Sequence, residues 1–150
     1  GRKLRKALVL AAKRGVKVQL LLQGKYEYFM QYYAARPVYG VLLAAGVEIH
    51  EYSASFLHAK VAVVDGQWAT VGSYNLDPLS LLLAREANVS VQHRPFAETL
   101  RSRLVFAMQH QGDRMDPAEY AERPFRQRCF EWTAYALMRM ALKLQGRKYL

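Results

Sequence analysis

His58 and Lys60 stand two positions apart at the start of an apolar run, and their spacing is the first sign of chemistry in this sequence. On an extended strand, residues i and i+2 project from the same face, so an imidazole and an ammonium there can meet one ligand. The pair suits an anion. Ser73 and Asn75 repeat this spacing past the next predicted strand and add a hydroxyl and an amide that can donate to phosphate oxygens.

Attack on a phosphodiester needs a nucleophile, positive charge near the non-bridging oxygens and a proton for the departing alkoxide. His58 can be the nucleophile if an acceptor holds its other ring nitrogen, and Glu86 is the best candidate for that acceptor. Gly72 would let the backbone come close. His50, His93 and His110 have no matched partner in the sequence, and we expect them to be surface or packing residues.

Several helices and strands must position these residues. Apolar spacing predicts helices over residues 1–14, 28–45 and 95–110, the second broken or kinked near Pro37 and capped by Gly46. Strands are predicted over residues 16–22, 47–52, 59–64, 68–71 and 86–92, and Asp65-Gly66 favours a hairpin turn. Helices alternating with strands predict an α/β domain with α/β/α layers and a largely buried, mixed sheet.

A polar segment with two prolines, residues 111–124, is predicted to link this domain to a basic amphipathic helix over residues 125–150. The helical wheel puts the apolar residues of this helix on one face and its cations on the other, with Trp132 and Tyr135 towards the polar side. The apolar face consists of Phe130, Thr133, Ala134, Leu137, Met140, Ala141 and Leu144, and the basic face of Arg128, Arg139 and Lys143. Packing on its own domain and contact with a membrane surface remain equal alternatives for it.

The composition fits one folded domain, since the 150 residues are 52% apolar. The single Cys129 cannot form an internal disulfide, and no Cys/His cluster has zinc spacing, so we expect a reducing compartment, no metal and no cofactor. The net charge of +10 lies in the flanks and predicts a polyanionic partner, either nucleic acid or an anionic lipid leaflet, or else a solvated basic face. Because residue 1 is glycine, we expect a piece of a longer chain.

The block HAKVAVVDGQWATVGSYNLDPLSLLLAREAN resembles the phospholipase D superfamily, whose signature combines H-x-K-x4-D with G-S-x-N and a later Glu. The matching residues are His58, Lys60, Asp65, Gly72, Ser73, Asn75 and Glu86. The resemblance implies a catalytic set of His58, Lys60, Asp65 and Glu86, in which His58 forms a phosphohistidine, Glu86 orients it and Asp65 is mainly structural. It also implies phosphate binding by Lys60, Ser73 and Asn75.

Nearly the whole chain is similar to the C-terminal half of bacterial cardiolipin synthases of the B-type subgroup, with WATVGS and NLDPLSL as the narrower cues. Ala84-Arg85 departs from that pattern just before Glu86. The family uses two such motifs, and residues 1–110 carry one, so the resemblance implies that the N-terminal half of the same protein, or a second copy, completes the site. This chain alone should be inactive.

The resemblance implies a phosphatidyltransferase that makes cardiolipin from phosphatidylglycerol and a second phospholipid, bound peripherally to the cytoplasmic side of the bacterial inner membrane. A phospholipase D-type nuclease or phosphodiesterase is the alternative enzyme, although no Arg/aromatic stacking pattern favours a nucleic acid partner. A non-catalytic scaffold is the third hypothesis, and the complete set of site residues argues against it. The acceptor lipid and the oligomeric state do not follow from the sequence.

Overall fold

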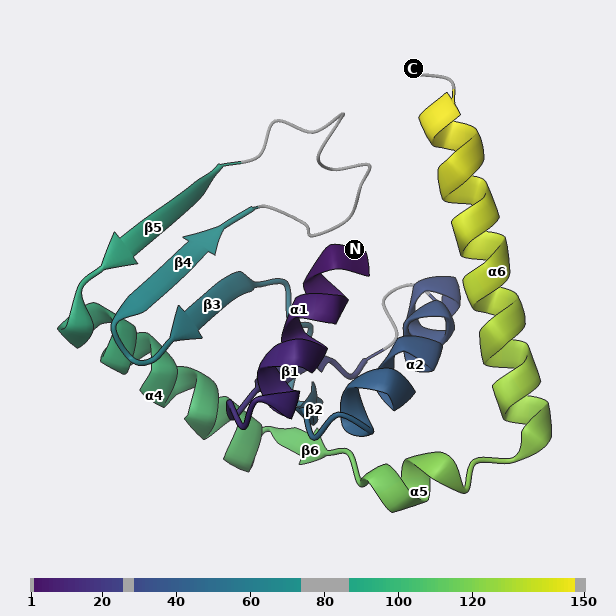
Figure 1. Cartoon of the computed structure of the whole chain (residues 1–150), viewed down its shortest axis with the longest axis horizontal. Helices are drawn as coiled ribbons and strands as arrows, with labels where there is room; N and C mark the ends of the chain where they lie inside the picture. Colours follow the sequence, from purple (N-terminus) through teal and green to yellow (C-terminus); the bar gives the residue numbers. More distant parts are fainter. Residues whose placement is uncertain (1, 26–28, 74–86, 148–150) are drawn as a thin grey trace. The chain divides into compact units, whose positions relative to one another are not determined.

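The computed structural model describes residues 2–25, 29–73 and 87–147 (Figure 1). Their contacts divide the chain into two compact units. The first unit contains Leu21–Gly24 and Glu51–Asp113, and the second contains Arg2–Leu20, Lys25–His50 and Arg114–Leu150. Helices and strands alternate along most of the chain, which confirms the predicted α/β class.

The sheets are smaller than the single mixed sheet that we expected, because the described residues form two sheets of three strands. One has the order β1 (Gln19–Gln23), β2 (Glu48–Tyr52) and β6 (Gly112–Arg114), and the other has the order β3 (Lys60–Val64), β4 (Trp68–Gly72) and β5 (Asn88–Gln92). The first sheet is mixed, since β2 is parallel to β1 and antiparallel to β6, as the bonds Glu48–Val18, Tyr52–Gly24, Ile49–Met115 and Ser53–Gln111 show. The second sheet is antiparallel.

Two helices of the second unit end at glycines in the left-handed region. Helix α1 (Arg2–Lys13) is followed by Gly15 at φ +90°, and α2 (Phe29–Leu43) by Gly46 at φ +86°. After each glycine the next N–H reaches back to the helix, Val16 to Ala11 O and Val47 to Leu42 O, both at 3.1 Å. This pattern satisfies carbonyls that the helix end leaves unpaired, and it confirms the predicted cap at Gly46. Helix α2 continues through Pro37, where we expected a break or kink.

The β3–β4 hairpin turns at Asp65-Gly66, as predicted. Both residues have positive φ, +53° and +64°, and Gln67 N donates to Val64 O at 3.1 Å. Positive φ at both central positions matches the right-handed twist of hairpin strands, and Asp-Gly tolerates it well. Helix α4 (Arg94–His110) packs on this sheet, where Ala69 of β4 and Ala97 of α4 are fully buried.

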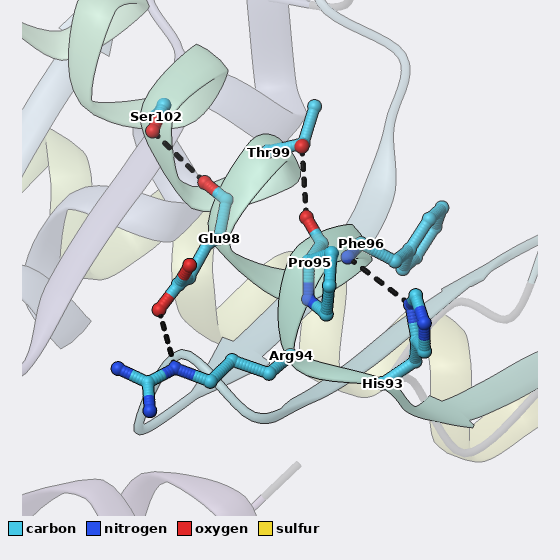
Figure 2. A network of polar contacts seen from close by, with 7 residues as sticks. All are labelled: His93, Arg94, Pro95, Phe96, Glu98, Thr99 and Ser102. Carbon is cyan, nitrogen blue, oxygen red and sulfur yellow. Dashed lines mark hydrogen bonds and ion pairs between the residues drawn. The ribbon is translucent and has the colours of Figure 1, made fainter.

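Helix α4 begins with a network of local polar contacts (Figure 2). The Nδ1 atom of His93 accepts a hydrogen bond from Phe96 N at 3.3 Å, so this imidazole is the N-cap of the helix. Arg94 and Glu98 form an exposed ion pair at 2.7 Å, one turn apart. The expectation that His93 is a surface residue therefore agrees with its role in the structure.

Buried polar groups join α2, α5 (Pro117–Ala121) and α6 (Phe125–Arg147) in the second unit. Glu131 is 1% exposed, and it accepts hydrogen bonds from Arg123 Nη1 at 2.5 Å and Gln127 Nε2 at 3.0 Å. Tyr120 is buried against Gly40 and donates its hydroxyl to Arg36 O. Strand β6 and helix α5 both lie within the range predicted as a linker, residues 111–124. The division of the chain into functional segments stays a prediction.

The face of α6 that packs on α2 coincides only in part with the apolar face expected from the sequence. Of that face, Ala134 is buried and Phe130 contacts the ring of Tyr33 on α2, with centroids 4.9 Å apart, whereas Leu137 and Met140 are 48% and 57% exposed. The charged Glu131 is buried instead, because Arg123 and Gln127 satisfy its oxygens. Within the described ranges, no helix has the length and apolar character that crossing a membrane requires.

Glu48 makes the stability of the second unit depend on pH. A hydrogen bond from Gln19 Nε2 at 2.8 Å is the largest of the effects that lower the pKa of Glu48 from its ordinary 4.5, and the charges of Lys17 and Arg114 at 3.8 and 3.9 Å lower it further. Together these groups outweigh burial, which acts in the opposite direction. A lowered folded-state pKa adds stability that is complete above the unfolded pKa and disappears as the pH falls through the folded one. In urea unfolding, Glu48→Gln should therefore be less stable than the unmodified protein at pH 7, and the gap should shrink below pH about 4.5. A gap of constant size from pH 7 to pH 3 would contradict this account.

Candidate active site

His58 and Lys60 are in contact at the start of β3. The Nζ atom of Lys60 lies against Nε2 of His58. An ammonium has only donors, so Nε2 is the acceptor and the ring proton is on Nδ1. In this arrangement Nε2 of His58 carries the lone pair that faces Lys60. The Nδ1–H group can then donate a hydrogen bond to a separate acceptor.

The register of the second sheet shows which face carries this pair. Lys60 is opposite Gly72, and Gly72 is opposite Asn88, so these three residues share one face at one end of the sheet. The fully buried Ala69 belongs to the other face. Lys60 therefore projects from the face opposite the one that buries Ala69, and His58 beside it is exposed to solvent.

Gly72 permits a close approach between β4 and the chain around β5. A Cβ atom at this position would lie 2.3 Å from Ala87 O and 1.9 Å from Asn88 Oδ1, and the first of these atoms belongs to the backbone. This contact is between strands, and the approach of the Gly72 backbone to a bound phosphate stays a prediction.

Gly72→Ala should lower the free energy of unfolding by about 1–3 kcal/mol, because the backbone of β4 or β5 must move. Urea unfolding of this variant measures the loss. Gly112→Ala is the matched control, since its added Cβ would meet its nearest neighbour at an ordinary 3.4 Å. Equal losses in the two variants would contradict the steric explanation.

Ser73 closes the open end of the β4–β5 pair. Its N–H donates to Ala87 O at 3.1 Å, and its Oγ accepts from Ala87 N at 3.2 Å. Ser73 directly follows the partner of Lys60, so its hydroxyl belongs to the same end of the sheet. Asn75 and Glu86 lie outside the described residues, and their roles stay predictions.

Asp65 lies at the other end of β3 from Lys60. It is exposed and occupies the hairpin turn, about 16 Å along the strand from Lys60 at 3.3 Å per residue. The structure does not bring its carboxylate to His58. This position fits the structural role that the family resemblance implies for Asp65.

Gln23 contacts the segment directly before His58, a contact that the sequence did not predict. Oε1 of Gln23, at the end of β1, accepts a hydrogen bond from Leu57 N at 2.5 Å, directly before His58. Gly24 next to it lies so close to β2 that an added Cβ would be 2.7 Å from Tyr52 O. A polar residue and a glycine that end an apolar strand were the available signal, and we interpreted them only as the end of the strand.

The other histidines have structural surroundings, as expected. His50 is 7% exposed in β2. His110 stacks on Phe106 with ring centroids 4.4 Å apart. With His93 capping α4, His58 is the histidine whose ring meets a lysine at the edge of a sheet.

The sequence is similar to known proteins over most of its length. Residues 1–105 match the family described as "Cardiolipin synthase, PLD-like domain". Cardiolipin synthase B of Escherichia coli K12 is 49% identical over 98 residues, which are 65% of this chain and 24% of that protein. Cardiolipin synthase of Geobacillus thermodenitrificans is 36% identical over 125 residues, or 83% of this chain and 25% of that protein. This chain thus spans about a quarter of the length of these relatives.

One solved structure shares the fold. It is Nuc of Salmonella typhimurium, a phospholipase D family member, with a TM-score of 0.61 and 23% identity over 74% of this chain and 72% of that chain. At this identity the likeness shows the fold alone. It agrees with the α/β architecture of the present structure.

Proposed function

The chain belongs to the family of cardiolipin synthases with a phospholipase D-like domain, and we propose that it supplies one half of a site for phosphatidyl transfer. The observation that carries this proposal is the contact between Lys60 Nζ and His58 Nε2. It pairs a nucleophilic nitrogen with a fixed positive charge at an exposed sheet edge, as attack on a phosphate diester requires.

In the first step, Nε2 of His58 attacks the phosphorus of a phosphatidylglycerol. A nitrogen–phosphorus bond forms, the bond to the glycerol oxygen breaks, and that oxygen leaves with a proton from a general acid. Lys60, and Ser73 and Asn75 with it, would bind the non-bridging oxygens. Glu86 would hold Nδ1–H and stabilise the charged ring.

In the second step, the hydroxyl of an acceptor lipid attacks the phosphohistidine. A base takes the hydroxyl proton, an oxygen–phosphorus bond forms, and the bond to Nε2 breaks. With phosphatidylglycerol as acceptor the product is cardiolipin. We assign the acid and base to a second motif of the same type, from another part of the full-length protein or from a second copy, because the described residues place one histidine at this site.

The basic character of the chain supports an anionic membrane as the place of reaction. We propose peripheral attachment to the cytoplasmic side of the bacterial inner membrane, since each Lys or Arg near an anionic leaflet adds about 1 kcal/mol of attraction. Nucleic acid is the competing polyanion, because a basic surface also attracts a phosphate backbone.

The test uses the full-length protein that contains this chain. It is incubated with phosphatidylglycerol vesicles, with mixed phosphatidylglycerol and phosphatidylethanolamine vesicles, and separately with plasmid DNA. Mass spectrometry should show cardiolipin together with released glycerol. Release of ethanolamine from the mixed vesicles would show that phosphatidylethanolamine also donates a phosphatidyl group, since it has no hydroxyl with which to act as the acceptor. Nicked plasmid without any lipid product would reject phosphatidyl transfer in favour of a nuclease.

A further inference from the structure

A groove of about 280 Å³ lies in the second unit, where α1, α2 and α6 contribute to its lining. Pro37 and Val41 of α2 form part of the apolar wall. Trp132 and Tyr135 of α6 add two aromatic rings, and Arg5 of α1 and Arg139 of α6 add two guanidinium groups. The groove thus combines an apolar surface with two positive charges, and none of its residues belongs to the candidate active site.

The aromatic side of the groove is held in place by its own contacts. The rings of Trp132 and Tyr135 meet edge to face, with centroids 5.7 Å apart. The guanidinium of Arg139 lies 5.5 Å from the centroid of Tyr135. Trp132 is nevertheless 57% exposed and Val41 is 50% exposed, so apolar surface remains in contact with water. Such a surface is unfavourable unless a partner covers it.

The charge around the groove selects an anion. Helices α1 and α6 each carry five Lys or Arg, and α2 carries Arg36. The one acidic residue in these three helices is Glu131, which is buried and paired with Arg123. No carboxylate on these helices therefore offsets the field of Arg5 and Arg139 at the groove.

We propose that this groove binds a single anionic phospholipid of a membrane surface. Arg5 and Arg139 take the headgroup phosphate, and Pro37, Val41 and the indole of Trp132 cover the upper part of its glycerol and acyl region. Tryptophan and tyrosine suit this position, because one end of each ring system is apolar and the other can face water.

A lipid explains the groove better than a nucleic acid does. A phosphate backbone would satisfy the arginines, but it would leave the aliphatic wall of Pro37 and Val41 uncovered. The groove residues Arg5 and Arg139 are also distinct from the residues to which we assign substrate binding, His58, Lys60, Ser73 and Asn75. Binding at the groove should therefore survive His58→Ala, so failure of this proposal is distinguishable from failure of the proposed function.

The first measurement is quenching of tryptophan fluorescence in the full-length protein by vesicles of brominated phosphatidylglycerol. Replacing Trp132 by Phe should remove most of the lipid-dependent quenching. Trp68→Phe is the matched control, because Trp68 lies in β4 of the other unit, and it should leave that quenching in place. Equal quenching in the two variants would overturn the proposal.

The second measurement is partitioning onto vesicles with 30% phosphatidylglycerol at fixed ionic strength. Arg5→Gln and Arg139→Gln should each weaken partitioning about fivefold, the loss that removing one charge near an anionic surface predicts. Arg126→Gln is the matched control, since Arg126 is exposed on the same helix and does not line the groove. It should weaken partitioning less than twofold. An equal loss in all three variants would show a diffuse basic surface in place of a site.

Competition identifies the ligand chemistry. Short-chain phosphatidylglycerol below its micelle concentration should displace the protein from the vesicles, whereas inorganic phosphate at the same concentration should not. Displacement by inorganic phosphate would overturn the role of the apolar wall. A contrary result would be that short duplex DNA displaces the unmodified protein from the vesicles more strongly than the soluble lipid does, and fails to displace Arg139→Gln in this way. That result would assign the groove to nucleic acid and overturn the lipid proposal.

Discussion

Replacing His58 by alanine is expected to reduce phosphatidyl transfer by the full-length protein about 10⁴-fold or more, because the variant has no atom that can form the covalent intermediate. The measurement is the initial rate of cardiolipin formation in phosphatidylglycerol vesicles. Since His58 is exposed, removing it should leave the free energy of unfolding nearly unchanged.

His110→Ala is the matched control for this loss. His110 is likewise exposed, but its ring stacks on Phe106 at the end of α4. It is distant from Lys60 in the sequence, and it is not the histidine that contacts Lys60. That variant should retain activity within about twofold. Full transfer activity in His58→Ala would contradict the nucleophile assignment and would favour the scaffold hypothesis for this half.

Replacing Glu131 by alanine is expected to lower the free energy of unfolding by about 3–5 kcal/mol, because it leaves the guanidinium of Arg123 largely buried without its carboxylate. The side chain of Arg123 is 15% exposed and that of Glu131 is 1% exposed, so water replaces little of the lost interaction. Urea unfolding at pH 7 measures the change. Removing both charges together, as Arg123→Met with Glu131→Leu, should recover much of it, since two apolar residues need no partner.

Glu98→Ala is the control for this prediction. Glu98 pairs with Arg94 at a similar distance, 2.7 Å, but the two side chains are 52% and 73% exposed. Exposed pairs of this kind contribute about 1 kcal/mol or less. A loss in Glu131→Ala as small as that in Glu98→Ala would show that burial does not set the energy of the Arg123–Glu131 pair.

Local patterns predicted the parts of the fold that depend on local chemistry. Asp65-Gly66 forms the expected turn because positive φ is inexpensive for these residues. Gly46 ends α2 for the same reason. The contact of His58 with Lys60 followed from their i, i+2 spacing at a strand, which does not depend on how distant segments pack.

The parts that the sequence did not predict depend on partners distant in the chain. The burial of Glu131 on α6 could not be predicted, because helical periodicity assigns an acid to the surface and cannot foresee Arg123. Strand β6 is Gly-Asp-Arg, which has no apolar alternation, and it becomes a strand because β2 offers it hydrogen bonds. Gln23 reaches Leu57 across 34 positions, a separation that no local pattern shows.

In this structure the ammonium of Lys60 lies against Nε2 of His58, the atom to which we assign the attack, so an electrophile must first displace the lysine. A phosphate diester carries anionic oxygens that can draw the ammonium away, so arrival of the correct electrophile uncovers the nitrogen that attacks it. Neutral carboxylic esters and acylating agents offer the ammonium nothing in exchange. If His58 is the nucleophile that we propose, the lysine that binds the phosphate would also disfavour attack of the histidine on the uncharged ester bonds of a lipid.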